Sequence, residues 1–307
     1  MKTARTEQRN PRTRGLDKKS ALEVLRALNR EDARVAQAVR RELPKIARAV
    51  EAVACAFRHG GRLFYVGAGT SGRLAFLDAA ECPPTFGTPP TMVQAILAGG
   101  AGALRRAREG AEDSAAQGAR DLRRAGVTKR DVVVGLSASG TTPYVLGALK
   151  AARRKGAVTV GVTANPSSLL ARRAAIGIAP DTGPEAIAGS TRLKAGTAQK
   201  MILNLLSTAA MVRSGRVYDN WMVYVALTNR KLRRRGARIL EETAGVNEPA
   251  ADRALQRAGY DLPVALVMLQ SGADAREARR RLARADGNVR QALEAARMRQ
   301  MRATRRA

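Results

Sequence analysis

The sequence is poor in the residues that build most metal and redox sites. Its 307 residues include one histidine, His59, and two cysteines, Cys55 and Cys82. The cysteines have neither the spacing of a redox motif nor that of a zinc site, and one histidine cannot supply a His-rich metal cluster. We therefore expect no metal, and we expect His59, beside Gly60-Gly61 at a predicted helix end, to have a capping or surface role.

Long apolar runs are also missing. No stretch approaches the length that spans a bilayer, and the N-terminus is polar and basic, without the apolar core of a signal peptide. Unpaired cysteines suit a reducing compartment. These absences predict a cytoplasmic protein with no membrane partner.

Acidic and aromatic side chains are scarce. The chain has 55 Lys and Arg against 26 Asp and Glu, a formal net charge of +29 and only 3% aromatic residues. Such charge is typical of nucleic-acid-binding proteins, but these basic residues are spread from end to end, and clusters such as Arg233–Arg235 and Arg279–Arg281 are short. Rings that could stack on bases are nearly absent. We expect no specific nucleic-acid partner, and only non-specific attraction to polyanions at low salt.

What the sequence does contain is a regular alternation of strands and helices. Five short apolar runs are predicted to be strands: Leu63–Val66, Met92–Leu97, Asp131–Leu136, Val158–Val162 and Ala175–Ala179. Helical patterns lie between them, for example over Gly102–Ala125 and Pro143–Lys155, and Pro44 interrupts an earlier helical region over Ser20–Arg58. Residues 1–19 are polar, and we expect them to be mobile or draped over a neighbour. The alternation predicts a parallel sheet covered by helices on both faces, with ligands at the carboxyl ends of the strands.

The most informative segment is Gly67-Ala68-Gly69-Thr70-Ser71-Gly72-Arg73, between the first predicted strand and a helix start. Its glycines let the backbone approach an anion, while main-chain N–H groups, the hydroxyls of Thr70 and Ser71 and the helix dipole favour negative charge. The segment lacks the Gly-Lys-Ser/Thr of a Walker loop. About twenty residues later, Gly87-Thr88-Pro89-Pro90 stands where a dinucleotide site has an acidic residue. We expect an anion cradle without a nucleotide cofactor.

A second hydroxyl-rich loop, Ser137-Ala138-Ser139-Gly140-Thr141-Thr142-Pro143, follows the third predicted strand. Either loop alone could be an ordinary strand-to-helix turn of small residues. Together they indicate a phosphate group held by side-chain hydroxyls, rather than a pyrophosphate held by the backbone alone.

Few acidic residues are candidates for chemistry. Glu81, in Ala80-Glu81-Cys82-Pro83-Pro84, is expected just beyond the helix that the first loop opens, with the two prolines fixing an extended turn. Glu112 follows the Gly99-Gly100 turn, so both carboxyls are expected near the same edge of the sheet. Two carboxyls facing one substrate can divide the work of base and acid. The alternative is that both are ordinary surface charges.

A third polar segment, Gly183–Lys200, leads from the last predicted strand into a long apolar helix over Gln199–Val212. Its Glu185, Ser190 and Lys194 either cap and solvate the first turn of that helix or form a third wall of a sugar-phosphate pocket.

From about Arg235 the chain is purely helical and repeats itself. Apolar positions recur 27 residues later: Leu255, Ala258, Leu262, Ala265 and Leu266 correspond to Leu282, Ala285, Val289, Ala292 and Leu293. Gly259-Tyr260-Asp261 corresponds to Asp286-Gly287-Asn288. Each unit is predicted to be two helices joined by a Gly-containing turn, so that two units make a small bundle that serves as an oligomerisation element or a lid.

Taken in order, these motifs resemble one family. The segments GAGTSGRL, DAAECPPTFG, EGAEDS, SASGTTPYV and GPEAIAGSTRLKAGTAQKMILNLLSTAAMVRSGRVY are similar to those of the N-acetylmuramic acid 6-phosphate etherases and of their relative, the glucokinase regulatory protein. The resemblance runs from about Thr6 to the C-terminal helices. It implies a phosphosugar-binding sugar isomerase (SIS) domain over 53–220, an α/β fold in which a parallel five-stranded sheet forms an αβα sandwich. N-terminal helices over 1–52 precede it, and a small all-helical domain over 235–300 follows.

The resemblance also implies a reaction. The D-lactyl ether at C3 of N-acetylmuramic acid 6-phosphate is cleaved to N-acetylglucosamine 6-phosphate and D-lactate by a cytoplasmic homodimer that needs no cofactor. The base and acid fall on Glu81 and Glu112, and we favour Glu81 as the base at C2 and Glu112 as the acid that assists loss of lactate. The positions that bind substrate correspond to Thr70, Ser71, Ser137, Ser139, Thr142, Glu185, Ser190 and Lys194.

The sequence departs from the family pattern at two positions. Thr141 stands where Arg is common, and Tyr224 where Asp is usual, which bears on substrate fit and local packing. Two other functions remain open: a non-catalytic phosphosugar-sensing module like the regulatory relative, and a sugar-phosphate isomerase of the same fold. The presence of both Glu81 and Glu112 disfavours the first, and the second leaves the long third segment unexplained.

Overall fold

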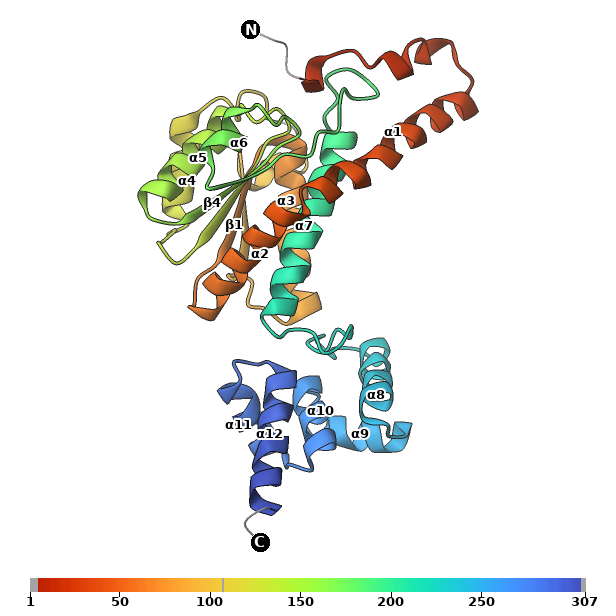
Figure 1. Ribbon diagram of the computed structural model, residues 1–307, viewed down its shortest axis with the longest axis vertical. Helices are drawn as coiled ribbons and strands as arrows, with labels where there is room; N and C mark the ends of the chain where they lie inside the picture. Colours follow the sequence, from red (N-terminus) through yellow and green to blue (C-terminus); the bar gives the residue numbers. More distant parts are fainter. Residues whose placement is uncertain (1–4, 107, 305–307) are drawn as a thin grey trace. The chain divides into compact units, whose positions relative to one another are not determined.

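The computed structural model describes residues 5–106 and 108–304 (Figure 1). The chain divides into two compact units, one made of Met1–Ala80 and Pro90–Ala210 and the other of Glu81–Pro89 and Met211–Ala307. Each unit has its own apolar core. This division does not test the predicted domain limits, 1–52, 53–220 and 235–300, which stay a prediction.

The first unit is built on a sheet of five parallel strands in the order β2-β1-β3-β4-β5. The strands are β1 (Leu63–Gly67), β2 (Val93–Leu97), β3 (Val132–Leu136), β4 (Val158–Val162) and β5 (Ile176–Ile178). Every residue of β1 and β3 is buried, as expected for central strands that are covered on both faces. The predicted α/β fold and all five predicted strands are confirmed.

Helices surround this sheet, with α4, α5 and α6 on one side of it and α2, α3 and α7 on the other (Figure 1). They are α1 (Ala21–Arg41), α2 (Leu43–Arg58), α3 (Gly69–Phe86), α4 (Ala115–Arg124), α5 (Pro143–Arg154), α6 (Leu169–Arg173) and α7 (Lys194–Arg213). Successive side chains of β1 point to opposite faces of the sheet. Phe64 and Val66 join the apolar cluster of α4 and α5, whereas the Tyr65 hydroxyl donates a hydrogen bond to Asp78 of α3 at 2.9 Å.

Local signals explain the boundaries of the N-terminal helices. A capping box opens α1, in which Ser20 and Glu23 satisfy each other's main-chain N–H groups. Pro44 stands in the first turn of α2, which confirms the predicted break there. His59 ends α2, and its Nδ1 lies 2.8 Å from the Cys55 carbonyl oxygen, which confirms the capping role.

Two helix predictions are wrong. The stretch Gly102–Ala125 is not one helix: it holds a 3-10 turn, η4 (Ala101–Leu104), then a loop through Gly110 at φ +72°, and α4 begins anew at the N-cap Ser114. The prolines Pro83 and Pro84 do not form an extended turn after α3 but lie inside its last turn. That helix ends at Gly87, which adopts φ +59° and donates to the Pro83 carbonyl at 2.9 Å.

The N-terminal segment is ordered by three 3-10 turns, η1 (Arg5–Glu7), η2 (Pro11–Thr13) and η3 (Leu16–Lys18). Thr6, Asn10 and Thr13 are buried. Of the two alternatives for residues 1–19, the described part is therefore draped over a neighbour, and residues 1–4 lie outside the description.

The second unit contains the predicted repeat, now visible in its hydrogen bonds. Its helices are α8 (Arg230–Ala244), α9 (Glu248–Arg257), α10 (Leu262–Ser271), α11 (Ala275–Arg284) and α12 (Val289–Thr304). The Tyr260 N–H donates to the Leu255 carbonyl at 2.7 Å, and 27 residues later the Gly287 N–H donates to Leu282 at 2.8 Å. Asp261 and Asn288 then cap α10 and α12 in the same way. The pairs α9–α10 and α11–α12 are thus two copies of one motif.

Tyr224 fills the position where the family pattern has Asp, and the structure shows what it does there. Its hydroxyl donates a hydrogen bond to the Gly287 carbonyl, in the turn between α11 and α12, and its ring lies under the Arg216 guanidinium, 4.8 Å from the ring centre. Burial raises the pKa of this phenol. The residue therefore has a packing role within the second unit.

Candidate functional site

The two hydroxyl loops flank one point of the sheet. From the central strand β1 the chain adds β2 on one side of the sheet, whereas β3, β4 and β5 follow in order on the other side. The last residues of β1 and β3, Gly67 and Leu136, are paired neighbours. Parallel sheets bind ligands at such a reversal of strand order, outside the carboxyl ends of the strands. The structure thus brings Thr70 and Ser71 to the same edge as Ser137, Ser139 and Thr142.

The first loop is short because α3 begins almost directly after β1. A Cβ on Gly72 would lie 2.8 Å from the Gly67 oxygen, and one on Gly67 would lie 2.7 Å from the Gly72 nitrogen, so both positions require glycine. Thr70 is half-buried and Ser71 is buried. The first N–H groups of a helix have no partner within it, so this turn offers donors and a positive dipole end to an anion.

The second loop holds its hydroxyls in a chain. Ser137 Oγ lies 2.8 Å from Thr142 Oγ1 and 3.4 Å from Ser139 Oγ, which in turn lies 2.9 Å from Thr141 Oγ1. Gly140 has φ +70°, and a Cβ there would lie 2.3 Å from Ser168 Oγ, so only glycine fits. The N-cap residue of α5, Thr142, makes no side-chain capping bond. These hydroxyls bond mainly to one another, and hydroxyl hydrogens rotate to suit an acceptor, so they can be turned toward a phosphate.

Glu112 lies beside the second loop. Its carbonyl oxygen accepts a hydrogen bond from the Tyr144 N–H at 3.0 Å, at the first turn of α5. Its side chain is exposed. The loop from Gly110 to Ser114 is thereby fixed with the Glu112 main chain at the carboxyl edge, as predicted for this residue.

Glu81 lies far along α3 from the first hydroxyl loop. It is an exposed residue inside α3, twelve residues after Gly69, which corresponds to about 18 Å along the helix axis. The expectation that it lies just past this helix is therefore wrong. Helix α3 continues through the Ala80–Pro84 stretch. It can do so because both prolines lie in its last turn, so the main-chain N–H groups that they lack cost hydrogen bonds only at the end of the helix. Within one chain, α3 separates Glu81 from the loop that opens it.

The third segment forms a buried network. Glu185 and Lys194 are fully buried. Both Glu185 oxygens accept main-chain N–H groups at the start of α7, from Lys194 at 3.0 Å and from Ala195 at 2.9 Å. Burial nevertheless raises the pKa of Glu185. Its two oxygens are thus engaged in capping α7, which is the first of the two alternatives for this segment.

The Lys194 ammonium is engaged as well, because it donates to Glu31 of α1 at 2.6 Å. Ser190 is half-buried in the turn before α7. Gly196 lies close to the first loop: a Cβ there would lie 3.6 Å from Thr70 Cγ2. The start of α7 thus stands directly beside the anion cradle.

Two members of this network, Asn10 and Glu31, were not predicted. Glu31 is 2% exposed and Asn10 4%. The sequence carries a signal for Glu31, since it interrupts the buried stripe of α1 formed by Ala27, Val35 and Ala38. An acidic residue at a core position needs a buried partner.

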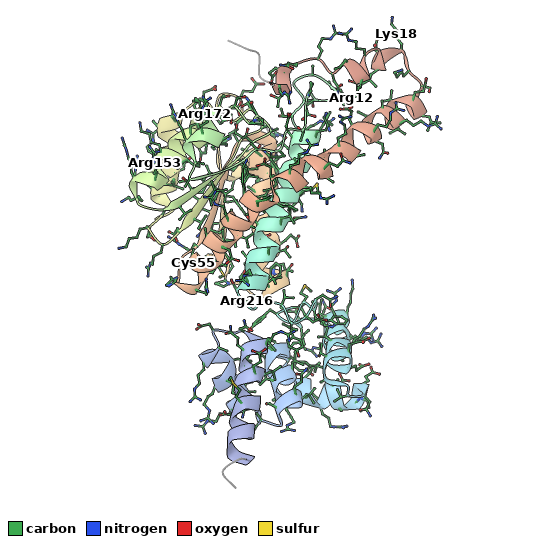
Figure 2. The ribbon with its side chains drawn as sticks, viewed as in Figure 1. Arg12, Lys18, Cys55, Arg153, Arg172 and Arg216 are labelled. Carbon is green, nitrogen blue, oxygen red and sulfur yellow. The ribbon has the colours of Figure 1, made fainter. Side chains whose placement is uncertain are left out.

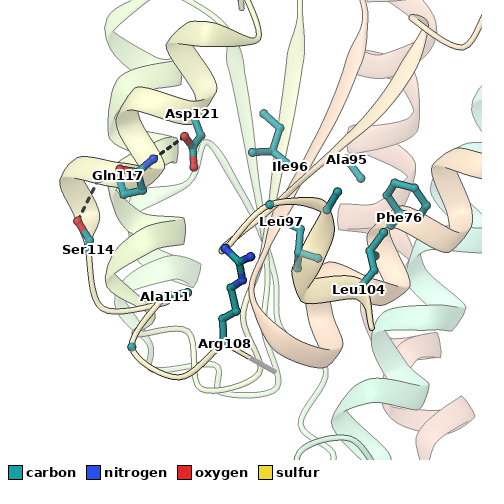
Figure 3. Close-up of a pocket in the computed structure, with 14 residues that line it drawn as sticks. Phe76, Ala95, Ile96, Leu97, Leu104, Arg108, Ala111, Ser114, Gln117 and Asp121 are labelled. Atoms are coloured by element: carbon teal, nitrogen blue, oxygen red, sulfur yellow. Dashed lines mark hydrogen bonds between the residues drawn. The ribbon is translucent and has the colours of Figure 1, made fainter. Parts of the chain in front are cut away.

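A cavity of about 650 Å³ opens beside the outer strand β2 (Figure 3). Its walls are apolar side chains such as Phe76, Ile96 and Leu104, and Arg108 reaches over it. Gly110, Ala111 and Ser114, on either side of Glu112, also line it. The cavity therefore provides room for a ligand next to the Glu112 loop.

Basic side chains also lie on the surface of the first unit. Arg153 and Arg172, for example, are exposed and point outward from separate helices (Figure 2). Over the described ranges, no helix is long and apolar enough to cross a membrane. In the same part of the chain, no three His, Cys, Asp or Glu residues come together as a metal site would require.

A five-stranded parallel sheet with hydroxyl loops at its switch point is the architecture of a SIS domain. Residues 111–209 match the SIS domain family, and residues 45–153 match the N-terminal SIS domain of the glucokinase regulatory protein. The chain is 52% identical over 288 residues to the N-acetylmuramic acid 6-phosphate etherase of Serratia proteamaculans, covering 94% of this chain and 97% of that one. It is 52% identical over 289 residues to the etherase of Geobacillus thermodenitrificans, covering 94% and 98%. The chain belongs to the N-acetylmuramic acid 6-phosphate etherase family.

Solved structures are more distant. The phosphoheptose isomerase of Neisseria gonorrhoeae superimposes with a TM-score of 0.49 and 18% identity, over 62% of this chain and 98% of that chain.

Proposed function

We propose that this protein cleaves the D-lactyl ether of N-acetylmuramic acid 6-phosphate, giving N-acetylglucosamine 6-phosphate and D-lactate. The observation that carries the proposal is the 52% identity to etherases over 94% of the chain. The same relatives disfavour the phosphosugar-sensing alternative. The reaction is that of a carbon–oxygen lyase acting on a small-molecule phosphosugar in the cytoplasm.

The chemistry needs a base, an acid and water. In the open-chain sugar the C1 aldehyde acidifies the C2 proton, so a carboxylate can remove it; the electron pair then forms the C2–C3 double bond as the C3–O bond breaks. An acid protonates the departing lactate oxygen, and water adds back at C3 while C2 regains a proton. Because the aldehyde supplies the acidity, the proposed reaction requires no metal and no organic cofactor.

We assign Glu81 as the base and Glu112 as the acid. The phosphate is assigned to Thr70, Ser71, Ser137, Ser139 and Thr142, where neutral hydroxyls and helix N-termini suit a dianion. The position of Ser190 beside the start of α7 supports a contact with the sugar. For Glu185 and Lys194, whose polar atoms are engaged with α7 and Glu31, the geometry favours a supporting role.

The position of Glu81 supports a homodimer as the active form. The axial distance along α3 exceeds the distance from the phosphate to C2 in a hexose 6-phosphate, so Glu81 cannot serve a sugar whose phosphate lies at the N-terminus of the same helix. A second copy of the chain can supply Glu81 to the loops and Glu112 of the first. The site is then complete only in the dimer.

The direct test is incubation with N-acetylmuramic acid 6-phosphate and an assay for D-lactate. Absence of D-lactate from a protein that still binds the phosphosugar would reject the proposed activity.

Mixed dimers test the shared site. A dimer of one Glu81→Gln chain and one Glu112→Gln chain keeps one intact site if each site takes its two carboxyls from different chains, so about half the wild-type activity returns. If each chain used its own pair, the mixed dimer would be as inactive as either parent.

A further inference from the structure

The N-terminal residues 5–13, which we call the strap, lie along residues 181–193, which we call the wall segment. The Gly189 N–H donates to the Thr6 carbonyl at 3.2 Å, Asn10 Nδ2 donates to the Pro184 carbonyl at 3.1 Å, and Thr13 Oγ1 donates to the Ala186 carbonyl at 2.8 Å. All three strap residues are buried. The wall segment has no strand or α-helix of its own, so these bonds are a large part of what fixes its path.

Glu31 joins the strap to the start of α7. Its carboxylate accepts hydrogen bonds from Asn10 Nδ2 at 2.7 Å, Arg12 Nη2 at 3.1 Å and Lys194 Nζ at 2.6 Å. Lys194 is the first residue of α7 and is fully buried. A buried charge with a single acidic partner has one low-energy position, because any displacement leaves it unpaired.

The start of α7 in turn borders the phosphate cradle. Of the next two residues, Ala195 donates its N–H to Glu185, and a Cβ on Gly196 would lie 3.6 Å from Thr70 Cγ2. A shift of the α7 N-terminus therefore moves the surface beside Thr70. The path runs from Asn10 through Glu31 and Lys194 to the cradle entirely through groups of low exposure.

We propose that the strap and Glu31 are positioning elements for the phosphosugar site: they hold the wall segment and the α7 N-terminus in the arrangement that binds the sugar phosphate. This inference rests on the proposed function for the identity of the ligand. It assigns no chemistry to Asn10, Thr13 or Glu31, which do not face the reacting atoms.

The test compares strap variants with a capping variant. Asn10→Ala and Thr13→Val each remove strap bonds and should raise KM for N-acetylmuramic acid 6-phosphate roughly tenfold, the cost of one buried hydrogen bond, with kcat unchanged. Ser20→Ala is the matched control. It removes the N-cap of α1 and lowers stability to a similar extent, but it touches no wall residue and should leave KM unchanged.

Two further readouts do not depend on turnover. Binding of N-acetylglucosamine 6-phosphate, measured by calorimetry, should weaken by the same factor in the strap variants. Trypsin cleavage after the exposed Arg192 should become faster in them, and the phosphosugar should slow it again.

The outcomes separate this inference from the proposed function. A wild-type protein that binds the phosphosugar but releases no D-lactate overturns the etherase activity, while the strap is still judged on binding and cleavage. Strap variants with wild-type KM, binding and cleavage overturn the positioning role. So does an equal rise of KM in Ser20→Ala, which would reduce the effect to general destabilisation.

Discussion

The second hydroxyl loop and the Glu31–Lys194 network are both polar clusters in the first unit, but they differ in charge, in burial and in the partners to which they bond. The loop hydroxyls are neutral and bonded mainly to one another, and all but that of Ser137 belong to residues that are not fully buried. Glu31 and Lys194 are charged and buried, and Glu31 is bonded to the strap as well as to α7. Neutral groups with rotatable hydrogens can be redirected to a ligand at little cost, whereas a buried ion pair cannot. The difference predicts that substitutions in the loop change binding alone, whereas substitutions of the charged groups in the network chiefly change stability.

The sharpest contrast is between two kinds of glutamate. Glu81→Gln and Glu112→Gln should each lower lactate release by about 10²–10⁴-fold, since proton transfer is lost, while the free energy of unfolding changes by less than about 0.5 kcal/mol because both side chains are exposed. Glu81→Gln should also abolish exchange of the C2 proton with deuterium, and Glu112→Gln should affect exchange less. Wild-type lactate release from either variant removes that residue from the mechanism.

Glu31→Gln should chiefly lower stability. It leaves Lys194 buried without its counter-ion, so we expect a loss of about 3–5 kcal/mol in the free energy of unfolding, measured in urea at pH 7. Lowering the pH should cause part of the same loss in the free energy of unfolding of the wild type. The Arg12 hydrogen bond, with those of Lys194 and Asn10, lowers the pKa of Glu31 from 4.5 to about 2. Its stabilisation, about 3 kcal/mol, is therefore complete above pH 4.5 and is lost as the pH falls towards 2.

The Glu31→Gln variant is the control for this pH effect, because it has no carboxyl to titrate at position 31. Between pH 5 and pH 3, wild-type stability should fall more steeply than that of Glu31→Gln. Parallel curves would show that Glu31 is not the titrating group.

The hydroxyl loops should give a smaller effect, confined to binding. Ser71→Ala and Ser139→Ala should each weaken phosphosugar binding by about 1–3 kcal/mol, the cost of an unmade hydrogen bond to a charged group. Their midpoints of unfolding should stay close to wild type. Equal turnover of N-acetylmuramic acid with and without its phosphate would contradict the assignment of these loops.

Chelation should have no effect at all. Dialysis against a chelator should leave the rate of lactate release unchanged, because the two carboxyls and the aldehyde supply the proposed chemistry. Loss of activity that returns with a divalent ion would point instead to a metal held by carboxylates such as Glu81, Glu112 and Asp113.

Local patterns predicted those parts of the fold that local chemistry determines. The strands follow from the sequence because buried parallel strands are continuous apolar runs, and the C-terminal repeat because its apolar positions recur at a spacing of 27 residues. The two hydroxyl loops follow from it as turns rich in glycine and hydroxyl residues.

The features that sequence patterns missed depend on distant contacts. Proline at Pro83 and Pro84 normally signals a helix end, yet α3 contains both in its last turn. The strap cannot be inferred from residues 1–19 alone, because its partners in the wall segment lie more than 170 residues away. Glu81 lies twelve residues into α3, about 18 Å along its axis, so the helix itself carries this carboxyl away from the edge where the strands end.

The strap also has a consequence for how the protein is made. The partners of residues 5–13 at 184–189 are synthesised nearly 180 residues after them, roughly 10–40 s later at usual rates of translation. During that interval Thr6, Asn10 and Thr13 lack their partners in the wall segment, although Asn10 can already bond to Glu31. Docking of the strap on the wall segment is thus a late step of biosynthetic folding, because it must wait for residues 184–189.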